Sequence, residues 1–209
     1  MLEMSLGRYY GRRPVKKNLM EIFDPSNIRY EEYRFHTYAV VDGVKYPMLW
    51  SDLEDGLLEY DILFKEEKLR EKLFKVAPFL IALDFESEGG KEESLALIET
   101  CRMHNGAIFF STHLTFGQTL EKMRTLFYLY DDEEKVEGVL RFYEPRIFSE
   151  LMHEPNKALH QAFFSKVYCY WCEDTKEENS IAKYFYTPKG IGHQHITLEC
   201  KSGENSPYV

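Results

Sequence analysis

The stretch Pro78-Phe-Leu-Ile-Ala-Leu-Asp84 is a nearly continuous apolar run that ends in an acidic residue. Runs of this kind are typical of a strand whose sheet is covered on both faces. Residues 38–43 and 107–111 have a similar character, and segments with helical periodicity lie at 65–76, 92–104 and 115–130. This alternation predicts an α/β fold with a mostly parallel sheet flanked by helices.

The pattern changes beyond Pro155, where a short helix at 158–164 precedes an aromatic strand at 166–172 and further strand pieces at 181–186 and 195–200. We therefore expect an α/β domain over residues 38–154 and a short C-terminal α+β lobe over residues 155–209. Residues 1–37 form a predicted basic arm, because the first twenty residues hold five basic side chains and one acidic one, a net charge of +4. The arm is interpreted as solvated chain, and the alternative is a docking arm for an acidic partner.

Composition excludes several classes of protein. The chain has 209 residues, of which 44% are hydrophobic, and this is enough to bury a core. A net charge of −9 argues against nucleic acid as the main partner, since phosphate binding needs a basic surface. Four cysteines are too few for a disulfide scaffold. The first residues lack an apolar core of the kind found in secretory signals, and no apolar run is long enough to cross a membrane, so a cytoplasmic protein is expected.

The segment Val139-Leu-Arg-Phe-Tyr-Glu-Pro-Arg-Ile-Phe148 is predicted to be a buried strand that runs into a helix. Pro145 suits the first turn of that helix, and Arg146 lies where the helix dipole disfavours a cation. Two interpretations follow for Arg141, Glu144 and Arg146. An anion site would use the two guanidinium groups, whereas an internal ion-pair lock would fix the strand-helix junction. We favour the lock, because arginines removed from water are rarely left unpaired.

The succession of residues 38–43, Pro47, 78–84, 107–111 and 141–146 resembles the chaperones, also called adaptors, of bacterial type VI secretion effectors. The family hallmark R-F-Y-D-P-R corresponds to Arg141–Arg146, with Glu144 in place of the aspartate. Residues 163–167 and Trp171 resemble a second family pattern, in which Gly-Pro usually stands at the positions of Ser165 and Lys166.

The resemblance implies a non-enzymatic protein that binds one effector in the producing cell and helps to load it onto a VgrG-type spike protein. No cofactor, metal, membrane or nucleic acid is implied. Members are similar in having an α/β lobe and a more variable C-terminal lobe, which is often helical. Here the C-terminal portion is short and is predicted to be partly strands, a departure that bears on how the effector is held.

The alternative is an α/β enzyme for phosphoryl transfer or metal-dependent hydrolysis. Asp42, Asp84 and the pair Ser111-Thr112 each follow a predicted strand, and carboxyl ends of parallel strands often carry ligand sites. Together with Arg146 they could form such a site. Against this, Val44 stands where many aspartate-based phosphatases have a second Asp, and there is no glycine-rich phosphate loop.

Cys169-Tyr-Trp-Cys172 has the spacing of redox and zinc sites, and completing a zinc site would require His193, His195 or Cys200. In a strand, however, residues three apart face opposite sides, so we predict no metal there. His193 and His195 share one strand face and are interpreted as an exposed pair.

Aromatic side chains of the C-terminal portion are the predicted partner surface, because aromatic residues are enriched at interface hot spots. The competing interpretation is that they cover the edge of the sheet. The residues are Tyr168, Tyr170, Trp171, Tyr184 and Tyr186.

Overall fold

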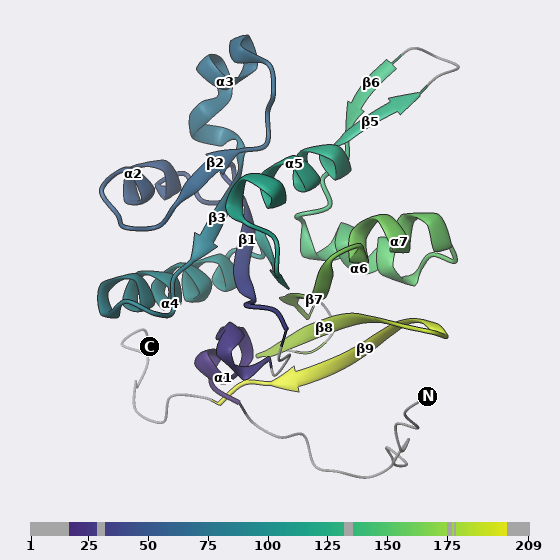
Figure 1. Cartoon of the computed structure of the whole chain (residues 1–209). Coiled ribbons are helices and arrows are strands. Elements are labelled where there is room, and N and C mark those ends of the chain that lie inside the picture. Colours follow the sequence, from purple (N-terminus) through teal and green to yellow (C-terminus); the bar gives the residue numbers. More distant parts are fainter. Residues whose placement is uncertain (1–16, 29–31, 132–135, 175–176, 178, 200–209) are drawn as a thin grey trace, which may run out of the picture.

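The computed structural model describes residues 17–28, 32–131, 136–174, 177 and 179–199. One seven-stranded sheet in the order β2-β3-β1-β4-β7-β8-β9 organises the chain (Figure 1). Every pairing between neighbouring strands of this sheet is antiparallel. The strands are β1 (His36–Asp42), β2 (Tyr60–Ile62), β3 (Pro78–Leu83), β4 (Ala107–Thr112), β7 (Val167–Glu173), β8 (Ser180–Thr187) and β9 (Gly190–Thr197).

The prediction of a mostly parallel sheet is therefore wrong. Helix α4 (Glu88–Met103) does return the chain so that β3 and β4 run in the same direction, as the strand-helix-strand pattern requires. The two strands are not neighbours, however, because β1 lies between them and pairs antiparallel with both. Local periodicity predicts that a helix connects two strands of the same direction. It does not predict that a third strand lies between them.

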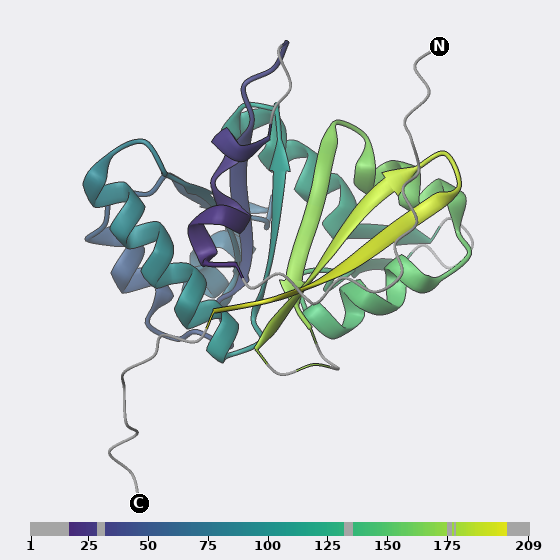
Figure 2. The ribbon, with the colours of Figure 1, turned by 90° about the horizontal axis from the view of Figure 1, so that it is seen from below.

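Two groups of helices cover the two faces of the sheet (Figure 2). Helices α1 (Leu19–Phe23), α2 (Leu49–Glu54) and α4 pack into one apolar cluster, together with Phe79 and Phe109 of the sheet. Helices α5 (Phe116–Phe127), α6 (Pro145–His153) and α7 (Lys157–Phe164) pack into the other, with Leu80 and Phe110. This confirms that the strand at 78–83 is covered on both faces. Helix α3 (Glu67–Leu73) has no buried residue.

Several helix ends follow from side chains a few positions away. Thr115 and Gln118 form a capping box at the start of α5. Pro145 occupies the first turn of α6, as predicted. Asn156 accepts a hydrogen bond from the backbone N–H of Leu159 and so caps α7.

The segment before α6 is a turn, so the predicted strand over residues 139–143 is wrong. Strand β5 (Tyr128–Asp131) and strand β6 (Val136–Val139) form a separate hairpin that extends from the main body (Figure 1). The chain leaves β6 at Val139, and Phe142 and Tyr143 then both enter the core cluster of α5, α6 and α7. Two successive buried side chains fit a turn, because successive strand residues would face opposite sides.

The strands after residue 155 extend the main sheet, since β7 pairs with β4 and is followed by β8 and β9. The domain boundary at residue 155 stays a prediction. Within residues 1–37, α1 inserts Ile22 and Phe23 into the core, so the interpretation of this range as solvated chain is wrong for α1. Arg8, Arg12, Arg13 and Lys16 lie outside the described residues. None of the helices that the structure describes combines the length and the apolar character needed to cross a membrane.

Candidate functional site

Arg141 is the centre of a group of charged residues at the end of β1, here called the Arg141 cluster (Asp42, Lys45, Arg141 and Glu144). Its Nη2 lies 2.9 Å from Oδ2 of Asp42, and its Nε lies 2.7 Å from Oε1 of Glu144. The Asp42 side chain is only 2% exposed, whereas the Arg141 side chain is 46% exposed. Arg141 therefore neutralises a carboxylate that the fold has removed from water.

The other contacts of the Arg141 cluster are also internal. Asp42 Oδ1 accepts a hydrogen bond of 3.0 Å from the backbone N–H of Val44, which fixes the turn after β1. Lys45 Nζ lies 3.7 Å from Glu144 and donates to the carbonyl of Asn105 at 2.8 Å. The cluster thus joins the end of β1 to the turn before α6 and to the turn before β4.

Tyr143 lies next to this cluster, with the guanidinium carbon of Arg141 5.9 Å from the centre of the Tyr143 ring. Burial raises the pKa of Tyr143 to about 12. The ring therefore stays neutral and adds to the packing beside the ion pairs.

Arg146 does not join the Arg141 cluster, contrary to the predicted three-residue lock. Its side chain is 83% exposed and pairs with Glu150, one turn further along α6, at 3.2 Å. The physical reason is the turn at 141–144, because it directs Arg141 towards β1 while α6 carries Arg146 on its solvent side. Sequence reasoning named Arg141 and Glu144 but missed Asp42 as their partner.

The carboxylates of the alternative enzyme hypothesis lie at opposite ends of the sheet. In the β1–β3 pairing, Asp42 is opposite Pro78 at the start of β3, whereas Asp84 follows the end of β3. Asp84 accepts hydrogen bonds from the backbone N–H groups of Glu86 and Ser87 and from the Ser87 hydroxyl at the start of α4. The bond from Ser87 is the main cause of its lowered pKa. Antiparallel pairing therefore separates residues that a parallel sheet would have brought together.

The hydroxyl groups at the end of β4 also have internal partners. Ser111 Oγ lies 3.0 Å from the Thr37 hydroxyl, and Thr112 Oγ1 donates to the carbonyl of Lys166 at 2.6 Å. Both side chains are buried.

Cys169 and Cys172 face opposite sides of the sheet, as their spacing on a strand predicts, and each belongs to a different core cluster. Burial raises the pKa of the Cys169 thiol to about 12 and also raises that of Cys172. The pair cannot share a metal ion in this fold. Cys200 lies outside the described residues.

The predicted aromatic surface is divided by the structure. Tyr170, Trp171 and Tyr184 are buried, so the prediction that they offer partner surface is wrong for these three. Strands β7 and β8 are inner strands covered by helices, and this covering is what buries them. Tyr168 and Tyr186 are each 40% exposed, on opposite faces.

Tyr168 belongs to a group of four rings and one lysine that we call the aromatic strip (Tyr33, Phe35, His113, Tyr168 and Lys183). The ring centroids lie 4.8 Å apart for Tyr33 and His113, and 5.6 Å apart for Phe35 and Tyr168. Lys183 Nζ lies 5.4 Å from the centre of the Tyr168 ring. Tyr33 is 50% exposed. The strip joins residues from before β1, after β4, and from β7 and β8, so only Tyr168 was visible as a candidate in the sequence.

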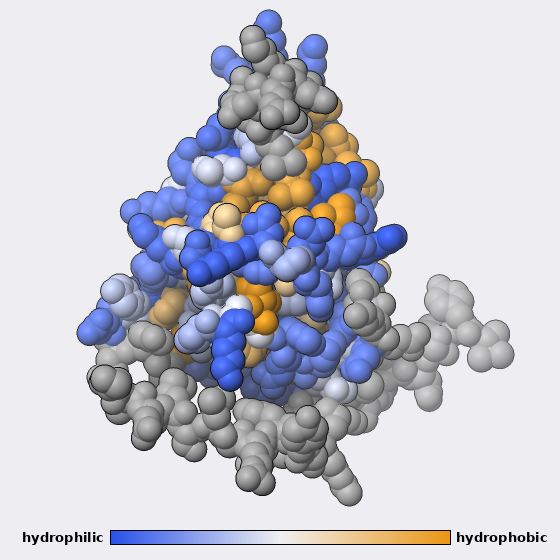
Figure 3. Space-filling model, turned by 90° about the vertical axis from the view of Figure 1, so that its right-hand side faces the viewer, coloured by the Kyte–Doolittle hydropathy of each residue, from blue (hydrophilic) through white to orange (hydrophobic). Residues whose placement is uncertain are grey.

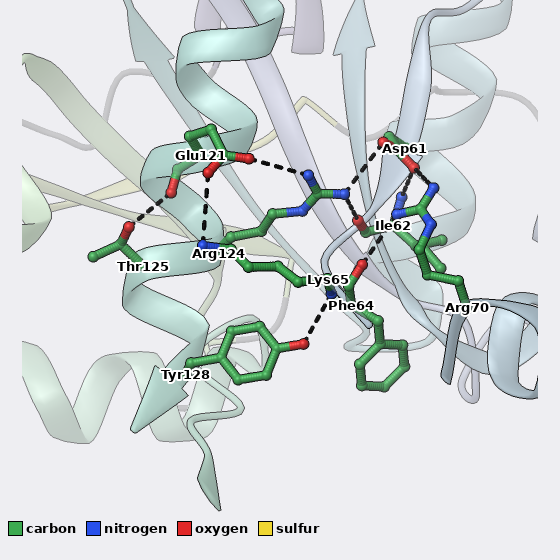
Figure 4. Close-up of polar contacts among 9 residues, drawn as sticks. All are labelled: Asp61, Ile62, Phe64, Lys65, Arg70, Glu121, Arg124, Thr125 and Tyr128. Carbon is green, nitrogen blue, oxygen red and sulfur yellow. Dashed lines mark hydrogen bonds and ion pairs between the residues drawn. The ribbon is translucent and has the colours of Figure 1, made fainter. Parts of the chain in front are cut away.

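A second charged network joins the edge strand β2 to helices α3 and α5. We call it the Asp61 cluster (Asp61, Lys65, Arg70, Glu121 and Arg124). Figure 4 shows two arginines converging on Asp61 of β2. Arg70 of α3 lies 2.6 Å from Oδ1, and Arg124 of α5 lies 3.3 Å from Oδ2. Arg124 also donates to the Ile62 carbonyl at 2.9 Å and to Glu121 at 3.1 Å. No local pattern predicted this cluster, since Asp61 and Arg124 are 63 residues apart in the chain.

Residues 37–161 match the family described as Domain of unknown function (DUF4123). The chain belongs to this family. The match spans more than half of the 209 residues. Neither the curated proteins nor the solved structures contain a match to the chain.

Both charged clusters lie inside the part of the chain that defines the DUF4123 family. Asp42, Asp61, Arg124 and Arg141 all fall within residues 37–161. The aromatic strip draws Tyr33, Tyr168 and Lys183 from outside it, and β7 to β9 follow it. The family region therefore supplies the charged contacts that hold the framework, while this chain's exposed aromatic surface is built largely from its flanks.

Lys122 of α5 carries an unusual ionisable group. Its Nζ donates to the Ala162 carbonyl in the last turn of α7 at 2.5 Å. Burial, together with the nearby charge of Lys166, lowers its pKa from 10.5 to about 8. The ammonium group is thus partly removed from water, and the negative end of the α7 dipole offsets part of the cost of burying its charge.

We expect the free energy of unfolding to rise with pH between about 8 and 10.5 because of Lys122. In this window the unfolded chain binds the proton that the folded chain has released, so raising the pH favours the fold. Lys122→Met should reduce that rise when urea unfolding is followed across the window. Lys157→Met, at an exposed position on α7, is the matched control because it removes one lysine and leaves Lys122 in place. An unchanged slope in Lys122→Met would contradict the assignment.

Proposed function

We propose that this DUF4123 protein is a non-enzymatic chaperone or adaptor of type VI secretion. In this role it binds one effector in the cytoplasm of the producing cell and assists its loading onto a VgrG-type spike protein. The resemblance of its 141–146 motif to effector adaptors and the family match both support this role.

The observation that carries the proposal is the internal neutralisation of the motif's central arginine. Arg141 is paired with Asp42 and Glu144, so the charges of the motif hold the fold together and leave no open oxyanion site at this point. Asp42 and Asp84, which an enzyme would need side by side, lie at opposite ends of β1 and β3. A framework of this kind is suited to presenting surfaces to other proteins.

The aromatic strip is the proposed effector surface. Exposed tyrosines next to a lysine supply large contact area at low entropic cost, and such residues dominate interface energetics. A groove of about 580 Å³ adjoins the strip, and Tyr33 and Phe35 line both. Arg34, Asp84 and Glu86 also line the groove and offer polar contacts of both signs to a bound segment.

An adaptor needs a second contact for the spike protein, and the opposite side of the molecule offers one. Figure 3 shows apolar side chains gathering on the side that carries the hairpin and helices α6 and α7. Val139 of β6 is 48% exposed, and Ile147 of α6 is partly exposed. Exposed apolar patches of this kind mark sites of protein interaction.

The proposal predicts that the two surfaces can be inactivated separately. We expect Tyr168→Ala to weaken effector binding about tenfold while the spike protein is still recovered. Val139→Asp should have the opposite effect, because a carboxylate on an apolar contact must be desolvated. The measurement is affinity purification of each variant from the producing cell, with partners identified by mass spectrometry.

Tyr186→Ala is the matched control, because Tyr186 is as exposed as Tyr168 but lies on the other face. Each variant is first compared with the wild type by thermal unfolding, so that a loss of folded protein is not mistaken for a loss of binding. Recovery of neither an effector nor a spike protein with the wild-type chain would count against the proposed function. Equal losses of effector binding in Tyr168→Ala and Tyr186→Ala would contradict the assignment of the aromatic strip as the effector surface.

A further inference from the structure

Three imidazole rings lie in a row on the face of the sheet covered by α6. His193 and His195 stand two residues apart on the edge strand β9, with ring centroids 5.3 Å apart. His153, in the last turn of α6, has its ring centroid 5.6 Å from that of His193. All three line one small pocket between α6 and the β8–β9 pair, together with Ser149, Asp174 and Tyr184.

Two carboxylates complete this group. Asp174 directly follows β7, its side chain is 4% exposed, and its Oδ2 contacts Nδ1 of His195. Glu177 lies in the connection between β7 and β8. The ligand atoms of Asp174, Glu177 and His195 all lie within 4.8 Å of one another. The fold therefore brings two acids and an imidazole to one point, with a second imidazole beside them.

An ion pair between Asp174 and His195 would account for only two of these groups. Glu177 places a second negative charge within 4.8 Å of the same point, and like charges at that separation repel. A divalent cation between the two carboxylates removes the repulsion. Imidazole nitrogen together with carboxylate oxygen is a donor set that zinc accepts at about 2.0–2.2 Å, whereas magnesium prefers oxygen alone.

We propose that Asp174, Glu177 and His195 bind a zinc-class divalent metal ion, with His193 in reach of a fourth position. Regular tetrahedral coordination places ligand atoms about 3.4 Å from one another. Asp174 and His195, which contact each other directly, therefore have to separate to admit the ion, and Glu177 has to approach by little more than 1 Å at most. The ion would fasten the connection after β7 to the edge strand β9. This site does not use Cys169 or Cys172, where the sequence predicted no metal, and it is independent of the proposed secretion role.

The test is calorimetric titration of untagged protein, freed of metal by a chelator, with zinc chloride. We expect one zinc ion per chain and a rise in the unfolding temperature on zinc addition, with no rise on addition of magnesium at the same concentration. Cobalt(II) provides a second measurement, since its visible absorption reports nitrogen and oxygen coordination directly.

Glu177→Gln is the decisive variant, because Glu177 is exposed and its replacement should leave the metal-free protein as stable as the wild type. We expect it to weaken zinc binding at least tenfold, and His195→Ala to do the same. His104→Ala changes an exposed histidine outside the pocket and should bind zinc like the wild type. Failure of the wild type to bind zinc, or equal affinity in Glu177→Gln, would overturn the site.

Discussion

Replacing Arg141 with alanine is expected to lower the free energy of unfolding by about 2 to 3 kcal/mol. Among the described residues, the substitution leaves the Asp42 carboxylate, 2% exposed, with the backbone N–H of Val44 as its donor. Breaking a fully buried pair costs more, but water reaches the half-exposed Arg141 side chain and reduces the loss. For a domain of this size the melting temperature should fall by roughly 5–10 °C, measured by calorimetry or circular dichroism.

Arg146→Ala is the internal control for that experiment. Arg146 carries the same charge five positions away, yet it is 83% exposed and pairs with an exposed glutamate. Exposed pairs contribute at most about 1 kcal/mol, so its loss should be close to the error of measurement. A double-mutant cycle between Arg141→Ala and Asp42→Asn should give a coupling energy above about 1 kcal/mol. If Arg141→Ala unfolds like the wild type but loses its partner, Arg141 is a partner contact and not a structural one.

Asp61→Ala should produce a loss of similar size, about 2 kcal/mol, because one carboxylate serves two arginines. Arg124 is the more affected, since its side chain is 12% exposed and Glu121 would be its one acidic partner among the residues that the structure describes. Besides lowering the stability of the whole fold, the substitution should loosen the edge of the sheet at β2. Amide hydrogen exchange in β2 and α3 is expected to accelerate more than exchange in β4, because Asp61 and Arg70 hold that edge to α5 (Figure 4).

The exposed pair between Arg34 and Glu86 provides the comparison for Asp61. Its side chains are 67% and 72% exposed, so Glu86→Ala should change the free energy of unfolding by less than about 1 kcal/mol. Uniform acceleration of exchange across the sheet in Asp61→Ala would mean that the Asp61 cluster stabilises the whole fold and not its edge.

Both clusters show why the site was only partly predictable. Arg141 and Glu144 are three residues apart, and their pairing could be proposed from the motif itself. Asp42 is 99 residues from Arg141, and Asp61 is 63 residues from Arg124, so nothing in either local pattern pointed to the partner. The same holds for Asp174 and His195, which are 21 residues apart and meet only because β8 and β9 fold back beside β7.

The sequence by itself determined most of the helices and most strands of the main sheet, and where many of them begin and end, but not the β5–β6 hairpin or the turn before α6. The apolar run at 78–83, the capping residues of α5 and α7 and the proline at the start of α6 all act through neighbours within a few positions. Tertiary structure alone decided the strand order, the insertion of β1 between β3 and β4, and the pairing of Asp42 with Arg141. The physical reason is one of range. Periodicity and capping depend on local geometry, whereas the order of strands depends on the free energy of closing the whole core.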